Sequence, residues 1–329
     1  MAEPASVDRN LAMEAVRITE AAAIAAARYM GRGDEEAADR AAAQAMREAL
    51  MRLAINGTIV IGHGGGAEAG FLFVGERVGQ GVGPAVAVAL LPLEGPTIIA
   101  KGEPNGLSVI AMAENGGFLQ IPSRYMEKIA VGSGLPENVV DLDAEPAENL
   151  TSLAAAKGAA IGDLVVCVLD RPRHHDLIAK IREAGARIML IADGDVAGVV
   201  VATQAESGVD AYMGVGGAAE GVLAAAALRC IGGQMQGRLV FDGDDEKKRA
   251  LELGITELGR KYSAAEMAGG DVTFAATGVT GGAMLSGVRT FAGCAIMHSM
   301  VMRSTTGTLR YIEAHRNFAN EARQQRAGG

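Results

Sequence analysis

Three short polar runs in this sequence carry side chains that could do chemistry. Arg171 and Arg173 lie in RPRHH, where two guanidinium groups could bind phosphate through paired hydrogen bonds or pair with nearby acids on the surface. Asp193 and Asp195 form Asp-Gly-Asp, a run that commonly shapes a turn through side-chain to backbone hydrogen bonds. His63 precedes three glycines whose N–H groups could cradle an anion, but no Gly-Lys-(Ser/Thr) follows as in a Walker loop.

The elements that must position these runs follow from the spacing of apolar residues. The first part of the chain predicts two helices laid on a sheet, and the part after about residue 150 alternates strand with helix. In such an α/β layer the loops at the C-terminal ends of the strands are available to ligands. The predicted helices cover 7–30, a segment beginning at Asp34 as N-cap, 175–184, 196–204 and 218–230. The predicted strands cover 58–62, 70–75, 85–91, 107–114, 164–170, 187–192, 210–215, 271–282 and a hairpin within 294–318 around Thr306-Gly307.

Composition limits the classes of function. The chain has 329 residues, 49% of them hydrophobic, which predicts a large core and about two domains. A net charge of -9 argues against general binding to nucleic acid or to an anionic membrane. Without an apolar run of membrane-spanning length or a signal-peptide pattern, we expect a cytoplasmic protein. Cys167, Cys230 and Cys294 are widely spaced in apolar surroundings, which indicates buried free thiols.

Nine short runs, taken together and in order, resemble the class II fructose-1,6-bisphosphatase family of the inositol-monophosphatase-like metal phosphatases. They cover almost the whole chain. The runs are GRGDEEAAD (31–39), NGTIVIG (56–62), PLEG (92–95), RYMEKIAVG (124–132), RPRHHDLI (171–178), ADGDVAG (192–198), GVGGAAEGV (214–222), FAATGVT (274–280) and VMRSTTGTLRYIEAHRNF (301–318).

This resemblance implies an α/β fold, a layered α-β-α-β-α sandwich of the inositol-monophosphatase/fructose-bisphosphatase type, in homo-oligomers. It also implies hydrolysis of the 1-phosphate of fructose 1,6-bisphosphate, and in some members of sedoheptulose 1,7-bisphosphate, with Mg²⁺ or Mn²⁺. We expect an N-terminal α+β domain at 1–155 with the metal loops and a C-terminal α/β domain at 156–329 with the sugar-phosphate contacts.

The metal and nucleophile loops depart from the family pattern. Of the family's oxygen ligands this chain keeps Asp34, Glu94 and Glu220. Side chains that cannot hold Mg²⁺, and one imidazole, replace the other acids and the attacking threonine. The replacements are His63, Gly65, Ala67, Ala87, Leu91 and Pro96, of which Gly65, Ala67 and Pro96 occupy positions tied to catalysis.

The sugar-phosphate half of the family site is retained. By resemblance, Arg171 and Arg173 bind phosphate, and Asp193 and Asp195 bind sugar hydroxyls. Two further positions, Tyr125 and Gly217, match ligand contacts of the family pattern. Tyr125 could equally pack in the core.

Three hypotheses follow from this pattern. The first is a sugar-phosphate-binding relative, for a monophosphate or a bisphosphate, that is catalytically silent or severely weakened. The second is an active phosphatase with a rearranged site in which His63 joins Asp34, Glu94 and Glu220 around Zn²⁺, Mn²⁺ or Fe²⁺. The third is a non-catalytic assembly or regulatory partner of an active paralogue. Two of the three retained acids also have a structural alternative: Asp34 as a helix N-cap, and Glu94 as an exposed turn carboxylate.

Overall fold

The computed structural model describes residues 8–63 and 70–318, and its first sheet joins strands from both ends of the chain. β1 and β3 run parallel, while β4, β11 and β13 continue the sheet in antiparallel fashion. In spatial order the strands are β12 (Arg289–Phe291), β13 (Cys294–Arg303), β11 (Thr273–Gly278), β4 (Leu107–Ala113), β3 (Ala85–Glu94), β1 (Asn56–Ile61) and β2 (Arg77–Val78), with β14 (Thr308–Asn317) paired to β13.

A second mixed sheet holds the strands whose ends carry the candidate site. Its order is β10 (Lys261–Ser263), β9 (Gln234–Val240), β5 (Tyr125–Val131), β8 (Ala211–Gly217), β6 (Val165–Leu169) and β7 (Arg187–Ile191). β6, β7 and β8 run parallel, so their C-terminal ends lie at one edge of the sheet. β5 runs antiparallel to β8 and brings its first residue, Tyr125, to that edge opposite Gly217.

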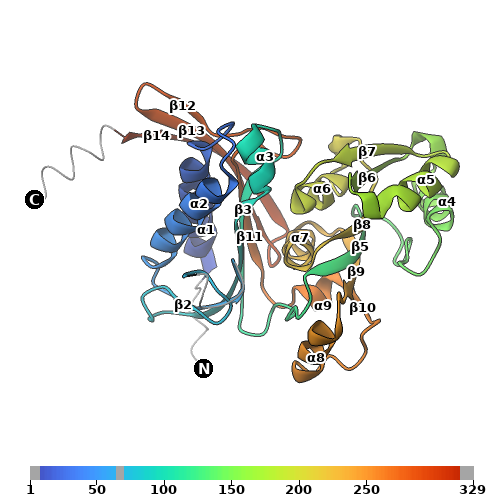
Figure 1. Ribbon diagram of the computed structural model, residues 1–329, viewed down its shortest axis with the longest axis horizontal. Helices are drawn as coiled ribbons and strands as arrows, with labels where there is room; N and C mark the ends of the chain where they lie inside the picture. Colours follow the sequence, from blue (N-terminus) through green and yellow to red (C-terminus); the bar gives the residue numbers. More distant parts are fainter. Residues whose placement is uncertain (1–7, 64–69, 319–329) are drawn as a thin grey trace, which may run out of the picture.

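Helices cover the outer faces of both sheets and fill the space between them (Figure 1). α1 (Asp8–Ala27) and α2 (Glu35–Leu50) cover the first sheet, and α4 (Pro146–Lys157) and α5 (His175–Glu183) cover the second. The middle layer contains α6 (Asp195–Ala202), α7 (Ala218–Ile231) and α9 (Ala264–Met267), while α3 (Pro96–Lys101) and α8 (Asp244–Glu252) lie at the edges. The predicted α-β-α-β-α layering is therefore present.

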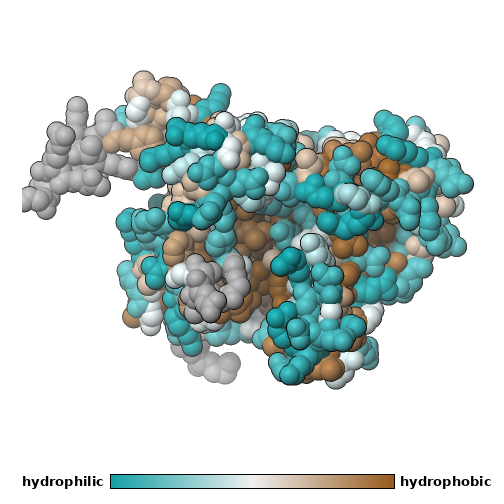
Figure 2. Space-filling view, in the orientation of Figure 1, coloured by the Kyte–Doolittle hydropathy of each residue, from teal (hydrophilic) through white to brown (hydrophobic). Residues whose placement is uncertain are grey.

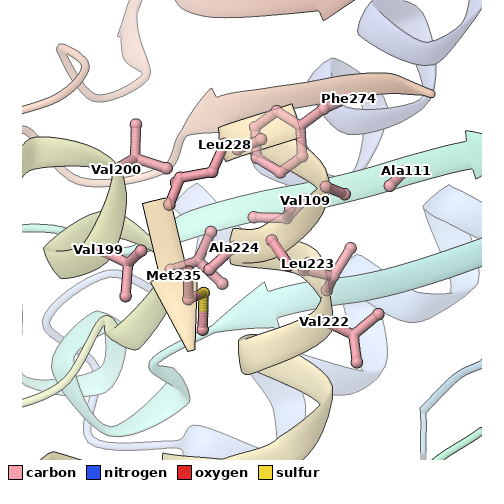
Figure 3. Close-up of a cluster of buried hydrophobic side chains, with 14 of the residues drawn as sticks. Val109, Ala111, Val199, Val200, Val222, Leu223, Ala224, Leu228, Met235 and Phe274 are labelled. Carbon is pink, nitrogen blue, oxygen red and sulfur yellow. The ribbon is translucent and has the colours of Figure 1, made fainter. Parts of the chain in front are cut away.

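Alternation along β3 shows how sequence produces these layers. Val88 and Leu90 pack toward α1 and α2, whereas Ala87 and Ala89 face the middle layer, because successive strand residues point to opposite faces. Small side chains on this inner face allow the alanine-rich α7 to approach closely. The resulting core between the sheets joins β4, β9, β11, α6 and α7 (Figure 3). A strand buried on both faces reads as a continuous apolar run, which is why AVAVALL predicted it.

Most predicted elements are present, with one clear error and several omissions. The predicted strand at 70–75 is wrong, because the chain there forms turns and Leu72 enters the core from a loop at positive φ. The sequence did not predict β5, β9, α3 or α4. The division near residue 155 stays a prediction; both sheets take strands from either side of it. Across the described ranges, no helix combines the length and apolar character needed to cross a bilayer.

Candidate functional site

The candidate site lies where β6, β7 and β8 end. The loop after β6 carries Arg171 and Arg173, the turn after β7 carries Asp193 and Asp195, and β8 ends at Gly217. Because parallel strands present their C-terminal ends at one edge, these three loops meet. The runs that carry the predicted ligand-binding residues therefore lie at one edge of the sheet, and their binding role stays a prediction.

A buried lysine and tyrosine hold the Asp195 carboxylate. Met126, Lys128 and Ala130 alternate along β5 toward the middle layer, and this alternation carries the Lys128 ammonium group to the N-terminus of α6. There Lys128 Nζ donates to Asp195 Oδ2 and, at 2.9 Å, to the Gly217 carbonyl oxygen. The Tyr212 hydroxyl donates to Asp195 Oδ1. Both oxygens of Asp195 are therefore occupied by partners from the second sheet.

Close packing at this point requires glycine at the end of β8. A Cβ atom on Gly216 would lie 1.9 Å from Asp195 Oδ2, and one on Gly217 would lie 1.7 Å from Glu220 Oε2. Any larger residue would displace a carboxylate. The two glycines therefore allow Asp195 and Glu220 to fold against the strand.

Glu94 closes the site from the first sheet. β3 ends at Glu94, and Gly95 then takes a left-handed conformation at φ 77° before Pro96 starts α3. The Glu94 side chain is 3% exposed, and its Oε1 accepts a 2.6 Å hydrogen bond from the Val196 N–H in the first turn of α6. Its Oε2 is buried without a hydrogen-bond partner. The alternative of an exposed turn carboxylate is therefore wrong, because the turn folds inward.

Four carboxylates interact at this point. Burial raises the pKa of Glu94 well above its ordinary value; the Val196 N–H lowers it, and the charges of Glu220, Asp195 and Asp193 raise it again. Burial also raises the pKa of Glu220, with Lys128 opposing this, although the residue stays partly exposed. The pKa of Asp193 is raised by burial and lowered by the Gly194 N–H and the Arg171 charge. The site is thus an acidic pocket with one buried ammonium group.

The basic side of the site is built on Tyr125 and His174. The Arg173 guanidinium lies 5.3 Å from the centre of the Tyr125 ring, and its Nε donates to the Val215 carbonyl at 2.9 Å. His174 is buried; its Nδ1 lies 2.7 Å from the Leu169 oxygen, and its Nε2 accepts from the Val215 N–H at 2.8 Å. Burial lowers the pKa of His174, so a neutral imidazole supports this loop.

Asp34 and His63 have hydrogen-bond partners of their own on α2. The exposed Asp34 carboxylate caps α2 by accepting from the Ala37 N–H at 2.9 Å. His63 Nε2 contacts Asp39 Oδ2 on α2 at 3.1 Å, and this hydrogen bond raises the pKa of the imidazole. Its neighbours Gly65 and Ala67 lie outside the described residues. Asp34 therefore caps a helix and His63 is hydrogen-bonded to Asp39, while the rearranged metal site stays a hypothesis.

A cavity of about 930 Å³ opens beside Glu220. Tyr125, Gly217 and Glu220 line one wall, Val60 and neighbouring β1 residues line another, and Arg249 and Leu253 approach from α8 and its C-terminal end. Figure 2 shows apolar surface in the hollow beside α8. The cavity is large enough for a small phosphorylated molecule.

Sequence reasoning missed two residues of the site. Lys128 lies inside an otherwise apolar strand, and a lysine in such a position is a signal, because lysine is rarely buried unless paired. Tyr212 gave no comparable signal, since a tyrosine in an apolar strand is ordinary. Asp195 looked like a turn residue or a hydroxyl ligand, yet its two oxygens bind Lys128 and Tyr212.

Five alternating layers, with polar groups gathered where β6, β7 and β8 end, place the chain in the class of layered α/β proteins. The sequence matches the family model for bacterial fructose-1,6-bisphosphatase, glpX-encoded, over residues 9–316. A D-fructose 1,6-bisphosphatase class 2/sedoheptulose 1,7-bisphosphatase of Synechococcus sp. (strain JA-3-3Ab) is 40% identical, with 93% of this chain and 95% of the relative covered. A protein of that same name from Trichodesmium erythraeum (strain IMS101) is 38% identical, with 95% and 97% covered.

The chain belongs to the class II fructose-1,6-bisphosphatase family, whose members are metal-dependent phosphatases that act on sugar bisphosphates. The donor set tests whether a divalent cation fits here. Within residues 8–63 and 70–318, no three His, Cys, Asp or Glu side chains are grouped to hold a metal ion. Leu91 offers no oxygen ligand, and one oxygen of Glu94 is bound to the Val196 N–H. In the described part of the loop from Leu91 to Pro96, the one carboxylate oxygen without a hydrogen-bond partner is Glu94 Oε2.

Proposed function

We propose that this chain binds a sugar phosphate and that its hydrolytic activity is absent or severely weakened. The observation that carries the proposal is the loop from Leu91 to Pro96. It has an apolar residue and a proline where the family has an aspartate and a threonine, and its one acid caps α6. Hydrolysis of a phosphate monoester needs charge neutralisation and a positioned water, and this loop supplies no group for either.

Ligand binding is supported by the groups on the opposite side of the site. Arg171 and the exposed Arg173 would bind phosphate, with Arg173 held over Tyr125. The partly exposed Asp193 would accept hydrogen bonds from sugar hydroxyls. We assign Asp195 a supporting role, because Lys128 and Tyr212 already occupy its oxygens.

The test is a hydrolysis assay combined with a binding assay on one sample. With fructose 1,6-bisphosphate and Mg²⁺ or Mn²⁺, we expect turnover far below the ordinary enzyme range of about 1 to 10³ per second. Turnover within that range would overturn the proposal that the chain is catalytically silent or severely weakened. Activity that appears only with Zn²⁺ or Fe²⁺ and disappears in His63→Ala would establish the rearranged metal site instead. That outcome would agree with the phosphatase names of the relatives.

Binding is measured as ligand-induced thermal stabilisation, expected at about 2.7 kcal/mol when ligand reaches a hundred times its Kd. Arg173→Ala should remove most of this shift. Arg182→Ala, an exposed arginine on α5, is the matched control and should leave it intact. Absence of any shift with sugar monophosphates and bisphosphates would favour a pure assembly protein.

A further inference from the structure

The cavity beside Glu220 carries two arginines that sequence reasoning did not single out. Within the described ranges, the charged residues that line it are Arg124, Glu220, Glu246 and Arg249. Neither Arg171 nor Arg173 lines it. Much of the remaining lining is apolar, and Figure 2 shows this surface in the hollow beside α8. Two guanidinium groups therefore share a cavity with few other charges.

The backbone of Arg124 fixes its position on the cavity wall. Its N–H donates to Glu246 Oε1 at 3.2 Å, and its carbonyl oxygen accepts from the Ala218 N–H at 2.9 Å. These bonds tie the residue to α8 and to the first turn of α7. The Arg124 side chain is exposed and has no charged partner among the described residues. Its guanidinium donors are therefore available to a ligand.

The carboxylate beside Arg249 is already occupied by backbone groups. Glu246 accepts the Arg124 N–H at Oε1 and the Asp242 N–H at Oε2, the latter at 2.8 Å. The exposed Arg249 guanidinium lies 4.0 Å from this carboxylate, a contact that neutralises its charge only weakly. Because Glu246 contacts both arginines, it also places them side by side. Arg249 thus remains able to bind an anion next to Arg124.

Glu220 offers hydrogen-bond acceptors to the same cavity. Its own backbone N–H donates to it, while the nearby Lys128 donates to Asp195 and to the Gly217 carbonyl. A carboxylate can accept about four hydrogen bonds, so Glu220 can accept another from a ligand hydroxyl. A protonated carboxyl group keeps this ability, because it retains an acceptor oxygen. The cavity therefore combines anion binding with recognition of hydroxyls.

We propose that Arg124 and Arg249 form a second phosphate-binding site, in which they hold the phosphate of a small phosphorylated polyol while Glu220 accepts hydrogen bonds from its hydroxyls. Two guanidinium groups suit phosphate better than carboxylate, because phosphate presents three oxygens and about two negative charges. The apolar part of the lining can pack against the carbon skeleton of the ligand. The inference stands on this cavity and does not depend on Arg171 or Arg173.

Calorimetric titration of the intact protein without added metal, with inorganic phosphate and fructose 6-phosphate as probes, tests the inference. The Arg173→Ala variant removes the first proposed site. It should still bind both probes, but more weakly than the wild type, because two carboxylates share the second site. Adding Arg124→Ala or Arg249→Ala should weaken this remaining binding at least about tenfold, the order expected for loss of a charge-assisted hydrogen bond.

A matched control comes from the same helix as Arg249. Lys248 is exposed on α8 and does not line the cavity, so Lys248→Ala removes one positive charge without touching the proposed site. It should leave the affinities for both probes unchanged. Weakening by Lys248→Ala equal to that by Arg249→Ala would overturn the site, because long-range charge alone would then explain the effect.

The remaining outcomes separate this inference from the proposed function. If Arg173→Ala alone abolishes binding, the second site is overturned and the proposed function stands. If Arg173→Ala binds like the wild type while Arg124→Ala and Arg249→Ala each lose affinity, the second site stands and the first phosphate contact falls. Affinities that neither Arg124→Ala nor Arg249→Ala changes overturn the second site. Binding of neither probe overturns both proposals.

Replacement of Glu220 tests the hydroxyl contact in the Arg173→Ala background. Glu220→Ala should weaken binding of fructose 6-phosphate several-fold and leave inorganic phosphate no weaker, since the arginines alone hold inorganic phosphate. Glu220→Gln keeps an acceptor oxygen and should restore most of the lost affinity. Equal weakening of both probes by Glu220→Ala, or no recovery in Glu220→Gln, would overturn the assignment of the hydroxyls to Glu220.

Discussion

The Val196 N–H donates a 2.6 Å hydrogen bond to Glu94 Oε1, so a side chain at the end of β3 closes the first turn of α6. This contact joins the first sheet to a helix of the middle layer at the centre of the candidate site. A carboxylate at a helix N-terminus is favourable, but burial and three neighbouring carboxylates oppose its charge. The contact therefore places a carboxyl group whose ionisation is disfavoured at the centre of the site.

The pH dependence of the free energy of unfolding should reveal the cost of ionising Glu94. The folded-state pKa of Glu94 lies above its unfolded value of 4.5. The contribution of its protonated carboxyl group to the free energy of unfolding is therefore fully present below pH 4.5, and it is lost as pH rises toward the folded pKa. Glu94→Gln removes that loss, so its free energy of unfolding relative to the wild type should increase with pH from about 4.5 upward. The slope is limited to about 1.4 kcal/mol per pH unit for one proton.

Chemical denaturation at several pH values measures this difference. Glu137→Gln, with an exposed side chain, serves as the control and should show no such rise. A difference between Glu94→Gln and wild type that stays constant from pH 4.5 to 8 would mean that Glu94 keeps an ordinary pKa.

Lys128→Met should be among the most destabilising single changes in the chain. It leaves the buried Asp195 carboxylate with Tyr212 as its remaining side-chain partner and the Gly217 carbonyl without the ammonium donor. Removing one member of a buried pair costs about 3 to 5 kcal/mol. Lys180→Met breaks the exposed pair with Glu145 and should cost no more than about 1 kcal/mol. Equal losses in the two variants, measured by urea denaturation, would show that the Lys128 pair is not structural.

Gly216→Ala should disrupt the same pair from the backbone side. The added Cβ would lie 1.9 Å from Asp195 Oδ2, and the carboxylate is held by two donors, so overpacking should cost about 1 to 3 kcal/mol. Gly243→Ala is the control: nothing lies within 4 Å of its Cβ and its backbone is extended, so its midpoint should hardly move. If both variants unfold at the wild-type midpoint, the site tolerates movement of Asp195.

The sequence predicted what depends on local pattern. The apolar run at 85–91 indicated β3, and the acidic start after Asp34 indicated a capped helix, because both signals act over a few residues. The strand predicted at 70–75 is wrong, because Leu72 is buried although it lies in a loop. Apolar character indicates that a residue is buried, and it does not show that the residue pairs in a strand.

The contacts of the site depend on sheet order, which local pattern does not contain. Lys128 meets Asp195 because β5 lies beside β8 and because its alternation places residue 128 on the inner face. Glu94 meets Val196 because the ends of two different sheets converge. The resemblance named Glu94 and Asp195 as ligand contacts, which stays a prediction, but gave no indication of these hydrogen bonds within the protein.

Restoring the family residues tests whether the substituted loops are the cause of the proposed loss of activity. The changes are His63→Glu, Gly65→Glu, Ala67→Asp, Ala87→Asp, Leu91→Asp and Pro96→Thr. Metal-dependent hydrolysis of fructose 1,6-bisphosphate should then appear, while single reversions should achieve almost nothing, because residues of one catalytic unit are strongly non-additive.

The restored protein should also depend on metal for stability. Ala87 is fully buried and Leu91 packs against the core between the sheets, so two new carboxylates there would lack partners in metal-free protein and lower the unfolding midpoint. Mg²⁺ or Mn²⁺ should raise that midpoint again, since binding to the folded state stabilises it. Omitting Ala87→Asp gives a comparison that isolates the most buried change. A sixfold variant that folds and is stabilised by Mn²⁺ yet hydrolyses nothing would show that the defect lies outside these six positions.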